Sequence, residues 1–413
     1  MLLQFKFSNF RCFAEEVTFD MAATSIKEHK YSLIDCNGVN ILPIAAVYGA
    51  NASGKSSFFM AIERMKSVVV QRFLDGGTLP EASKRSFSIP FMFQSKLSST
   101  PTSYEVSILI DGYQYKYGFT CTSETILKEY LYKKKLSKNP TVEKMIFKRN
   151  NSVFIGDVNQ KMRDELLYCA SRKSNKTLLL TEIGLREKEP ELCSIFEWFL
   201  GMNVTIFNGN EFLGSNAVSQ FLVGEFISKT NNNDIVNNYI SFIREIDPSI
   251  YGIKTITATN PDGEIVKIAQ TVHLVNGKKY DVPFELESEG TNKLLYISVL
   301  IFLVLEIGGT LFIDEFDSKI HPLILRRIVQ MFKDKKSNSK GAQLVFSAHN
   351  IICLDSSDLR RDEIWFVEKL NHKSTMYSLV DFDDGEGGVR SDLSFGKHYL
   401  SGRFGAVPFQ EEG

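Results

Sequence analysis

The stretch Gly49-Ala50-Asn51-Ala52-Ser53-Gly54-Lys55-Ser56 decides the fold. It follows an apolar run, residues 41–48, that predicts a buried strand, and it precedes residues 57–70, whose spacing predicts a helix. The arrangement matches G-x-x-x-x-G-K-[ST], in which small residues let backbone N–H groups surround phosphates. Lys55 would reach the terminal phosphates, and Ser56 would offer its hydroxyl to Mg²⁺. The alternative is a Gly/Ser turn that carries a lysine by chance, but both flanks fit the phosphate-binding loop.

The whole chain has the composition of an ordinary folded protein. Its 413 residues are 43% hydrophobic and 23% charged, with a formal net charge of −1. This length suits one large domain with insertions, or two to three modest ones. The near-neutral balance gives no overall attraction to nucleic acid, so such a contact would need a local basic patch.

The sequence predicts a cytoplasmic protein. The six cysteines are scattered without the close spacing of a zinc or redox pair, which suits a reducing compartment. The first residues alternate like a strand and lack the features of a secretory signal. The longest apolar run, Leu294–Leu305, is shorter than the roughly 20 residues of a membrane span, and it predicts a buried helix.

Periodicity divides the chain into segments of different character. Strand-like runs occupy Leu3–Phe7 and Val17–Phe19, and residues 104–119 predict a hairpin that turns at Asp111-Gly112. Residues 157–250 read as mostly helical, and strand-like alternation returns from Tyr251. A basic concentration at residues 133–149 is either a solvated strand edge, which we favour, or a nucleic-acid contact.

A second chemical centre lies in the C-terminal part. Residues 310–315 form an apolar strand that ends in Asp314 and Glu315. Such an acid can hold the Mg²⁺ shell, which we assign to Asp314, and its neighbour can activate the attacking water as a general base, which we assign to Glu315. A further apolar strand, residues 343–349, ends in His349, for which we expect a γ-phosphate contact rather than a structural role.

A Ser-x-Gly sequence, Ser288-Glu289-Gly290, stands at the predicted start of the buried helix. Backbone N–H groups and the Ser288 hydroxyl could form a second anion site there. A capped helix with no ligand explains these residues equally well.

Together these motifs resemble ABC-type ATPases, and most closely the prokaryotic AAA15 type. That group includes the RloA, abortive-infection and PARIS (AriA-like) phage-defence ATPases, and it is related to RecF, to SMC heads and to the ATPase part of the overcoming-lysogeny-defect nucleases. The resemblance covers nearly the whole chain. It is carried by residues 9–11, 49–56, 115–119, 288–291, 314–317, 321–322, 347–350, 359–366 and 399–408.

The resemblance implies an α/β fold: an ABC-type P-loop ATPase head with a mixed central sheet, an antiparallel β subdomain and a helical insertion. The expected parts are an N-terminal lobe (1–156), the insertion (157–250) and a C-terminal lobe (251–413). Lys55, Glu315 and His349 are then catalytic, Ser56 and Asp314 hold the metal, and Gln94 is a candidate for the Q-loop glutamine. The nucleotide-binding set is Gly49, Asn51, Ser53, Gly54, Lys55, Ser56, Ser57, Ser288, Gly290 and Asp317.

By the same resemblance, the protein binds ATP and Mg²⁺ and hydrolyses ATP. In ABC ATPases the signature, here Ser288 and Gly290, contacts nucleotide on a partner subunit, which implies a head-to-tail homodimer or a larger assembly. The implied role is the sensor ATPase of an anti-phage system that controls a separately encoded nuclease or toxin. The alternatives are a RecF/SMC-like ATPase that clamps DNA and a scaffold that binds ATP without hydrolysing it. A GTPase is disfavoured because the chain lacks Asn-Lys-x-Asp.

Overall fold

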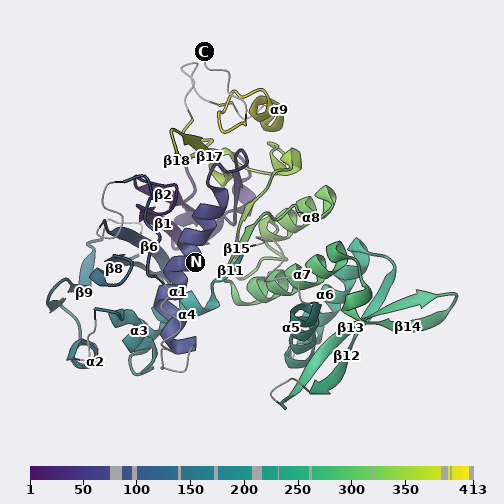
Figure 1. Cartoon of the computed structure of the whole chain (residues 1–413), viewed down its shortest axis with the longest axis horizontal. Helices are drawn as coiled ribbons and strands as arrows, with labels where there is room; N and C mark the ends of the chain where they lie inside the picture. Colours follow the sequence, from purple (N-terminus) through teal and green to yellow (C-terminus); the bar gives the residue numbers. More distant parts are fainter. Residues whose placement is uncertain are drawn as a thin grey trace.

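The computed structural model describes residues 1–74, 86–94, 100–137, 141–171, 175–206, 216–230, 232–259, 263–318, 320–382, 389–390 and 393–408. In Figure 1 the central sheet lies between two groups of elements. One group is an antiparallel sheet with helices against it. The other is a smaller sheet with three helices, and it projects away from the rest of the molecule.

The central sheet carries the predicted phosphate loop at the end of one of its strands. In order, its strands are β11 (Asn203–Ile206), β15 (Thr310–Asp314), β16 (Gln343–Ser347), β5 (Ile44–Tyr48), β17 (Ile364–Leu370) and β18 (Lys373–Ser378). Neighbours pair in parallel, except for the antiparallel pair β17–β18 at one edge. On β5, Ala45 and Val47 enter one hydrophobic core, whereas Ile44, Ala46 and Tyr48 enter the other. Burial on both faces explains the continuous apolar sequence of β5.

A seven-stranded antiparallel sheet stands beside the central one. Its strands, in order, are β10 (Val153–Ile155), β9 (Lys144–Arg149), β8 (Ile126–Lys135), β7 (Tyr113–Cys121), β6 (Thr102–Ile110), β1 (Leu2–Ser8) and β2 (Val17–Asp20). The predicted hairpin is β6–β7, and its turn residues Asp111 and Gly112 both have positive φ. One face is apolar: Phe5 packs on Phe58 of α1 (Lys55–Leu74), and Tyr117 packs on Phe199 of α4 (Pro190–Gly201).

The projecting group is built on the three-stranded sheet β12 (Ile250–Thr259), β13 (Ile265–Val275) and β14 (Lys278–Val282). Helices α5 (Asn216–Lys229), α6 (Asn233–Ile246) and α7 (Glu289–Ile307) pack beside it. Gly224 lets α5 approach β13 closely, because a Cβ there would lie 2.4 Å from the carbonyl oxygen of Lys267.

Residues 157–250 are more varied than the expected helical insertion. They contain α2 (Gln160–Ser171), α3 (Leu179–Gly184), α4, α5 and α6, but also β11, which pairs with β15 in the central sheet. Because β11 is only four residues long and lies among helices, its sequence gave no strand pattern. The three-part domain division stays a prediction.

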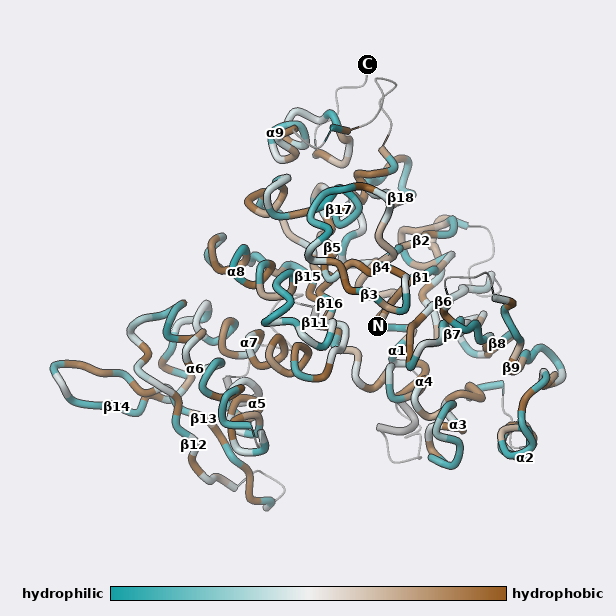
Figure 2. The backbone as a smooth tube through the Cα atoms, turned by 180° about the vertical axis from the view of Figure 1, so that it is seen from behind, coloured by the Kyte–Doolittle hydropathy of each residue, from teal (hydrophilic) through white to brown (hydrophobic). Residues whose placement is uncertain are grey.

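The expected buried helix is α7. It is long and apolar enough to cross a membrane, and Figure 2 shows it hydrophobic along much of its length. However, 67% of its most apolar window is buried inside the protein, so α7 is a core helix of the fold. The remaining elements are α8 (Pro322–Lys333), α9 (Phe395–Leu400) and the hairpin β3 (Ile34–Cys36) and β4 (Val39–Ile41).

Candidate functional site

The predicted phosphate loop connects β5 to α1 and depends on its glycines. Gly54 has φ 123°, and a Cβ there would lie 2.8 Å from Ser374 Oγ and 2.9 Å from Cys12 Sγ. At Gly49 a Cβ would lie 2.3 Å from the Val367 carbonyl oxygen. The loop is therefore held against β17 and β18, and only glycine fits at these two positions.

Lys55 is buried at the start of α1, with its ammonium inside the loop. Nζ donates hydrogen bonds to the carbonyl oxygens of Gly49, at 2.7 Å, and Ala50, at 3.0 Å. Burial lowers the pKa of Lys55, while the negative charges of Asp314, Glu315 and Asp317 act to raise it. The loop thus holds a cation beside a cluster of carboxylates.

Asp314 is fully buried at the end of β15, and Ser347 of β16 holds it. Ser347 Oγ donates to Asp314 Oδ1 at 2.5 Å and accepts from the Glu315 backbone N–H at 2.8 Å. Asp314 Oδ2 is buried without a hydrogen-bond partner among the described residues. Glu315 takes a left-handed backbone conformation, φ 50°, of the kind that persists where the surroundings enforce it.

Asp317 joins the acidic loop to the end of β16. Its Oδ2 accepts hydrogen bonds from the backbone N–H groups of His349, at 2.8 Å, and Asn350, at 2.6 Å. Its other oxygen, Oδ1, is buried and has no partner in the described part of the chain. His349 is exposed on the adjacent turn, so its ring is accessible to a ligand.

These elements enclose a pocket of about 540 Å³. It brings together the predicted loop residues Asn51, Ser53, Gly54, Lys55, Ser56 and Ser57 with Glu315 and His349. Gly49 is tied to the same site through Lys55, and Asp314 and Asp317 lie near enough to act on its pKa. The pocket is completed by residues to which the sequence assigned no role: Arg11, Cys12, Ala52, Ile89, Pro90, Met92, Phe93, Lys369 and His372.

Among those unassigned residues, Phe93 and His372 form an aromatic pair. Their ring centroids are 4.8 Å apart, and 59% of Phe93 is exposed. Gln94, the Q-loop candidate, does not line the pocket; its Nε2 donates to Asn9 Oδ1 at 3.1 Å. Within residues 90–94 the sequence indicated Gln94, whereas the structure places Phe93 in the pocket. Phe93 lies there because this loop packs against the β17–β18 turn, a contact between distant segments that the sequence does not show.

Ser288 and Gly290 lie outside the pocket, at the N-terminus of α7. Ser288 is exposed, and its Oγ accepts a hydrogen bond from the Thr291 backbone N–H at 3.1 Å, so it caps the helix. This helix cap is the alternative that the sequence allowed for Ser288.

Lys293 connects the start of α7 to the acidic loop, a link that the sequence analysis missed. Its Nζ donates to the carbonyl oxygens of Glu315, at 3.0 Å, and Ser318, at 2.6 Å. Lys293 is buried in the second turn of α7, directly before its apolar run. A lysine next to a predicted buried segment is the signal that could have identified it, because a buried charge needs a partner.

The donor set fits a hydrated Mg²⁺. Two buried carboxylate oxygens, Asp314 Oδ2 and Asp317 Oδ1, are without partners among the described residues. Both residues lie near Lys55, which lines the pocket together with Ser56. Mg²⁺ prefers oxygen ligands and is commonly bound by one or two carboxylates together with substrate phosphates. The protein alone therefore supplies only part of a coordination shell.

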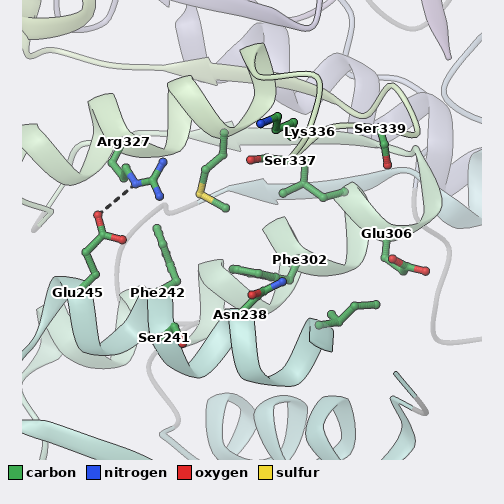
Figure 3. Close-up of a pocket in the computed structure, with 13 residues that line it drawn as sticks. Asn238, Ser241, Phe242, Glu245, Phe302, Glu306, Arg327, Lys336, Ser337 and Ser339 are labelled. Atoms are coloured by element: carbon green, nitrogen blue, oxygen red, sulfur yellow. Dashed lines mark hydrogen bonds and ion pairs between the residues drawn. The ribbon is translucent and has the colours of Figure 1, made fainter. Parts of the chain in front are cut away.

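A second pocket, of about 500 Å³, lies between α6, α7 and α8 (Figure 3). Its floor includes Phe242 and Phe302, and Glu245 on α6 faces Arg327 on α8 with Nε to Oε1 at 3.1 Å. It contains no glycine-rich loop, and its Glu245 and Arg327 neutralise each other. The first pocket, which contains the phosphate loop, is therefore the candidate site.

The fold and the pocket at the phosphate loop define a P-loop ATPase domain. The chain matches, over residues 44–166 and 201–355, the model of a family described as "AAA domain, putative AbiEii toxin, Type IV TA system". This match covers more than half of the chain, which belongs to that AAA-domain family.

Solved structures similar to this chain include SMC head domains. One, described as bound to the C-winged helix domain of ScpA, is 12% identical with a TM-score of 0.47 and covers 92% of this chain and 97% of its own. Another, from Thermotoga maritima, is 14% identical with a TM-score of 0.42 and covers 91% and 98%. No curated protein matches the chain.

Proposed function

We propose that this chain binds Mg-ATP and hydrolyses it to ADP and phosphate. The observation that carries the proposal is Asp314, a fully buried carboxylate directly before Glu315 and close to Lys55. One of its oxygens has no hydrogen-bond partner in the part of the chain that the structure describes. A buried charge without a full set of partners is costly, and a cation would satisfy it.

The chain's own residues take distinct roles. Lys55 gives up its contacts with the loop carbonyls and binds the terminal phosphates, while Glu315 accepts the proton of the attacking water. His349 contacts the γ-phosphate from the end of β16. Mg²⁺, held by Ser56 and Asp314, would neutralise phosphate charge when bound.

The second part of the proposal is a head-to-tail homodimer, or a larger assembly built from it. Ser288 and Gly290 lie outside the pocket of their own chain, and Ser288 is exposed. A second copy could present this turn, with its helix N-terminus, to the nucleotide. An interface in which each subunit completes the other's site closes as a symmetric pair.

We further propose that the protein acts in the cytoplasm as the sensor ATPase of a defence system, with a separate nuclease or toxin as its effector. The family description names a toxin and a type IV toxin–antitoxin system, which supports a role of this kind. ATP would close the dimer, and hydrolysis would open it to change the effector's state.

Hydrolysis is tested with Glu315→Gln, which keeps the shape of the side chain but removes the base. We expect ATP binding to persist and turnover to fall by about a hundredfold or more. Glu306→Gln, on the exposed end of α7, is the control and keeps wild-type turnover. Equal turnover of the two variants would refute the role of Glu315.

The shared site is tested by mixing two inactive chains, Lys55→Ala and Ser288→Asp. In a mixed dimer, one site combines the intact loop of the second chain with the intact Ser288 of the first. Random pairing should restore about a quarter of wild-type turnover. No recovery, together with a monomeric mass of the Glu315→Gln protein with Mg-ATP by light scattering, would refute the dimer and leave the ATPase proposal standing.

A further inference from the structure

The seven-stranded sheet has a polar face that no helix covers in the described structure. On its apolar face, Phe5, Val106, Tyr117, Leu131 and Phe147 stand in register across five strands, and all are fully buried. The residues between them point to the opposite face. That face presents Lys148, Tyr130, Gly118, Glu105 and Lys6 in one row across β9, β8, β7, β6 and β1.

Tyr130 lies flat on this polar face. A Cβ on Gly118 would come within 2.6 Å of Tyr130 Cζ, so the ring occupies the space above that glycine. Its hydroxyl donates to Glu105 Oε2 at 2.5 Å, which fixes the ring in place. Tyr132 follows on the same side of β8, with ring centroids 5.7 Å apart. The pair is a fixed aromatic platform with its outer side partly exposed.

Lysines surround this platform. On the same face, Tyr130 pairs with Lys148 of β9, and Lys128 and Lys134 flank the two tyrosines along β8. None of these three lysines, nor Lys6, forms an ion pair with another described residue.

Three acidic groups of the same face have hydrogen-bond or ion-pair partners. Glu105 accepts from Tyr130, Glu143 pairs with Lys116 at 2.6 Å, and Asp20 accepts from Gln4 at 3.0 Å. Tyr130 and Gln4 are uncharged, so Glu105 and Asp20 keep their negative charges, and Glu16 also lies near enough to raise the pKa of Tyr130. The four lysines without ion pairs still outnumber these three carboxylates, so the net charge around the platform is positive.

The basic side chains of residues 133–149 lie on both faces of the sheet. Lys133 turns to the helix side and pairs with Glu191 at 2.6 Å, and Arg149 is buried against Glu129 at 3.5 Å. These two are structural. Lys134 and Lys148 project from the polar face, and the exposed Phe154 of β10 stands opposite Lys148.

We infer that this face binds single-stranded nucleic acid, with its phosphates on Lys6, Lys128, Lys134 and Lys148 and a base stacked on Tyr130. Aromatic rings on a flat sheet surrounded by lysines suit this ligand, because every base has a π-face and the backbone is a chain of negative charges. Stacking requires unpaired bases, which favours a single strand over a duplex. The inference is independent of the proposed ATPase site.

The test is fluorescence anisotropy of a labelled 20-nucleotide oligothymidine with the full chain. Lys128→Gln/Lys148→Gln should weaken binding by about tenfold or more and reduce the salt slope by about 1.4, since each phosphate contact on a single strand contributes about 0.7. The matched control is Lys278→Gln/Lys279→Gln on the exposed β13–β14 hairpin, which should bind like the wild type. Equal losses in both variants would overturn the assignment to this face.

Stacking is tested with Tyr130→Leu, which still covers Gly118, against Tyr130→Phe, which keeps the ring. We expect about a tenfold loss for Leu and little change for Phe. Phe154→Ala, at an exposed position, serves if Tyr130→Leu does not fold. A duplex of the same length that binds as tightly as the single strand, with no effect of Tyr130→Leu or Phe154→Ala, would overturn the inference.

Discussion

The sequence analysis assigned nucleotide-binding residues to the loop end of the central sheet and to the N-terminal end of α7, and these two regions differ in how well their polar groups are satisfied. At the sheet, Asp314 and Asp317 are buried and each keeps one oxygen without a partner among the described residues. At α7, Ser288 is exposed and its hydroxyl already caps the helix.

This difference indicates which part of the proposed nucleotide site a single chain supplies. Buried polar groups are normally satisfied, so these two carboxylate oxygens, which lie near Lys55, are where we propose that a cation binds. An exposed and satisfied serine has no such requirement in the single chain. Its role in catalysis, if the dimer forms, depends entirely on a second copy.

The largest effect should come from the loop end. Asp314→Asn replaces a buried carboxylate oxygen with an amide nitrogen that cannot bind a cation, and we expect ATP turnover to fall about a thousandfold. Steady-state phosphate release measures it. Asp234→Asn, on the exposed first turn of α6, should retain normal turnover. If turnover of Asp314→Asn stays within tenfold of the wild type, Asp314 is not essential and the loop end does not differ from the α7 end as we propose.

The next prediction tests whether the N-terminal end of α7 contributes to catalysis. Ser288→Asp preserves the helix cap, because aspartate caps as well as serine does, but it places a negative charge where a partner's phosphates would lie. We expect an unchanged unfolding midpoint and about a hundredfold lower turnover. Asn232→Asp adds the same charge at the capping residue of α6 and should leave turnover unchanged. Normal turnover of Ser288→Asp would show that α7 does not contribute to catalysis.

Lys293 joins the two ends, so its removal should affect both stability and catalysis. Lys293→Met leaves the Glu315 and Ser318 carbonyl oxygens without this donor, at a cost of about 2 kcal/mol in the free energy of unfolding. Turnover should fall about tenfold as Glu315 loses its support. Denaturant unfolding and phosphate release measure the two effects. Lys340→Met, which breaks only an exposed pair with Glu306, should change neither.

The smallest effect concerns the adenine base of ATP, which we expect to contact the exposed ring of Phe93. Phe93→Ala removes an exposed ring from the pocket and should raise the KM for ATP about tenfold with kcat unchanged. Tyr31→Ala, at an exposed aromatic residue outside the pocket, should leave both constants unchanged. A fall in kcat without a change in KM would show that Phe93 does not hold the base.

Local patterns predicted the elements that meet at the site. The phosphate loop, the β6–β7 hairpin, α7 and the strand before Asp314 and Glu315 could be read from glycine spacing, turn residues and apolar runs, because each depends on neighbours in sequence. Strand β11 could not be read, because it is a strand only through its pairing with β15. The ties of Ser347 to Asp314 and of Lys293 to Glu315 join residues 33 and 22 positions apart.

The sequence by itself determined the chemistry of the phosphate loop, because Gly54, Lys55 and Ser56 act through a backbone geometry that eight consecutive residues define. The tertiary structure decided what faces that loop. It placed Phe93 beside His372 and left one oxygen of Asp314 without a partner among the described residues. It also kept Ser288 outside the pocket and placed Lys128, Tyr130 and Lys148 on one face of a sheet. These arrangements depend on strand register and on packing between distant segments, which no local pattern specifies.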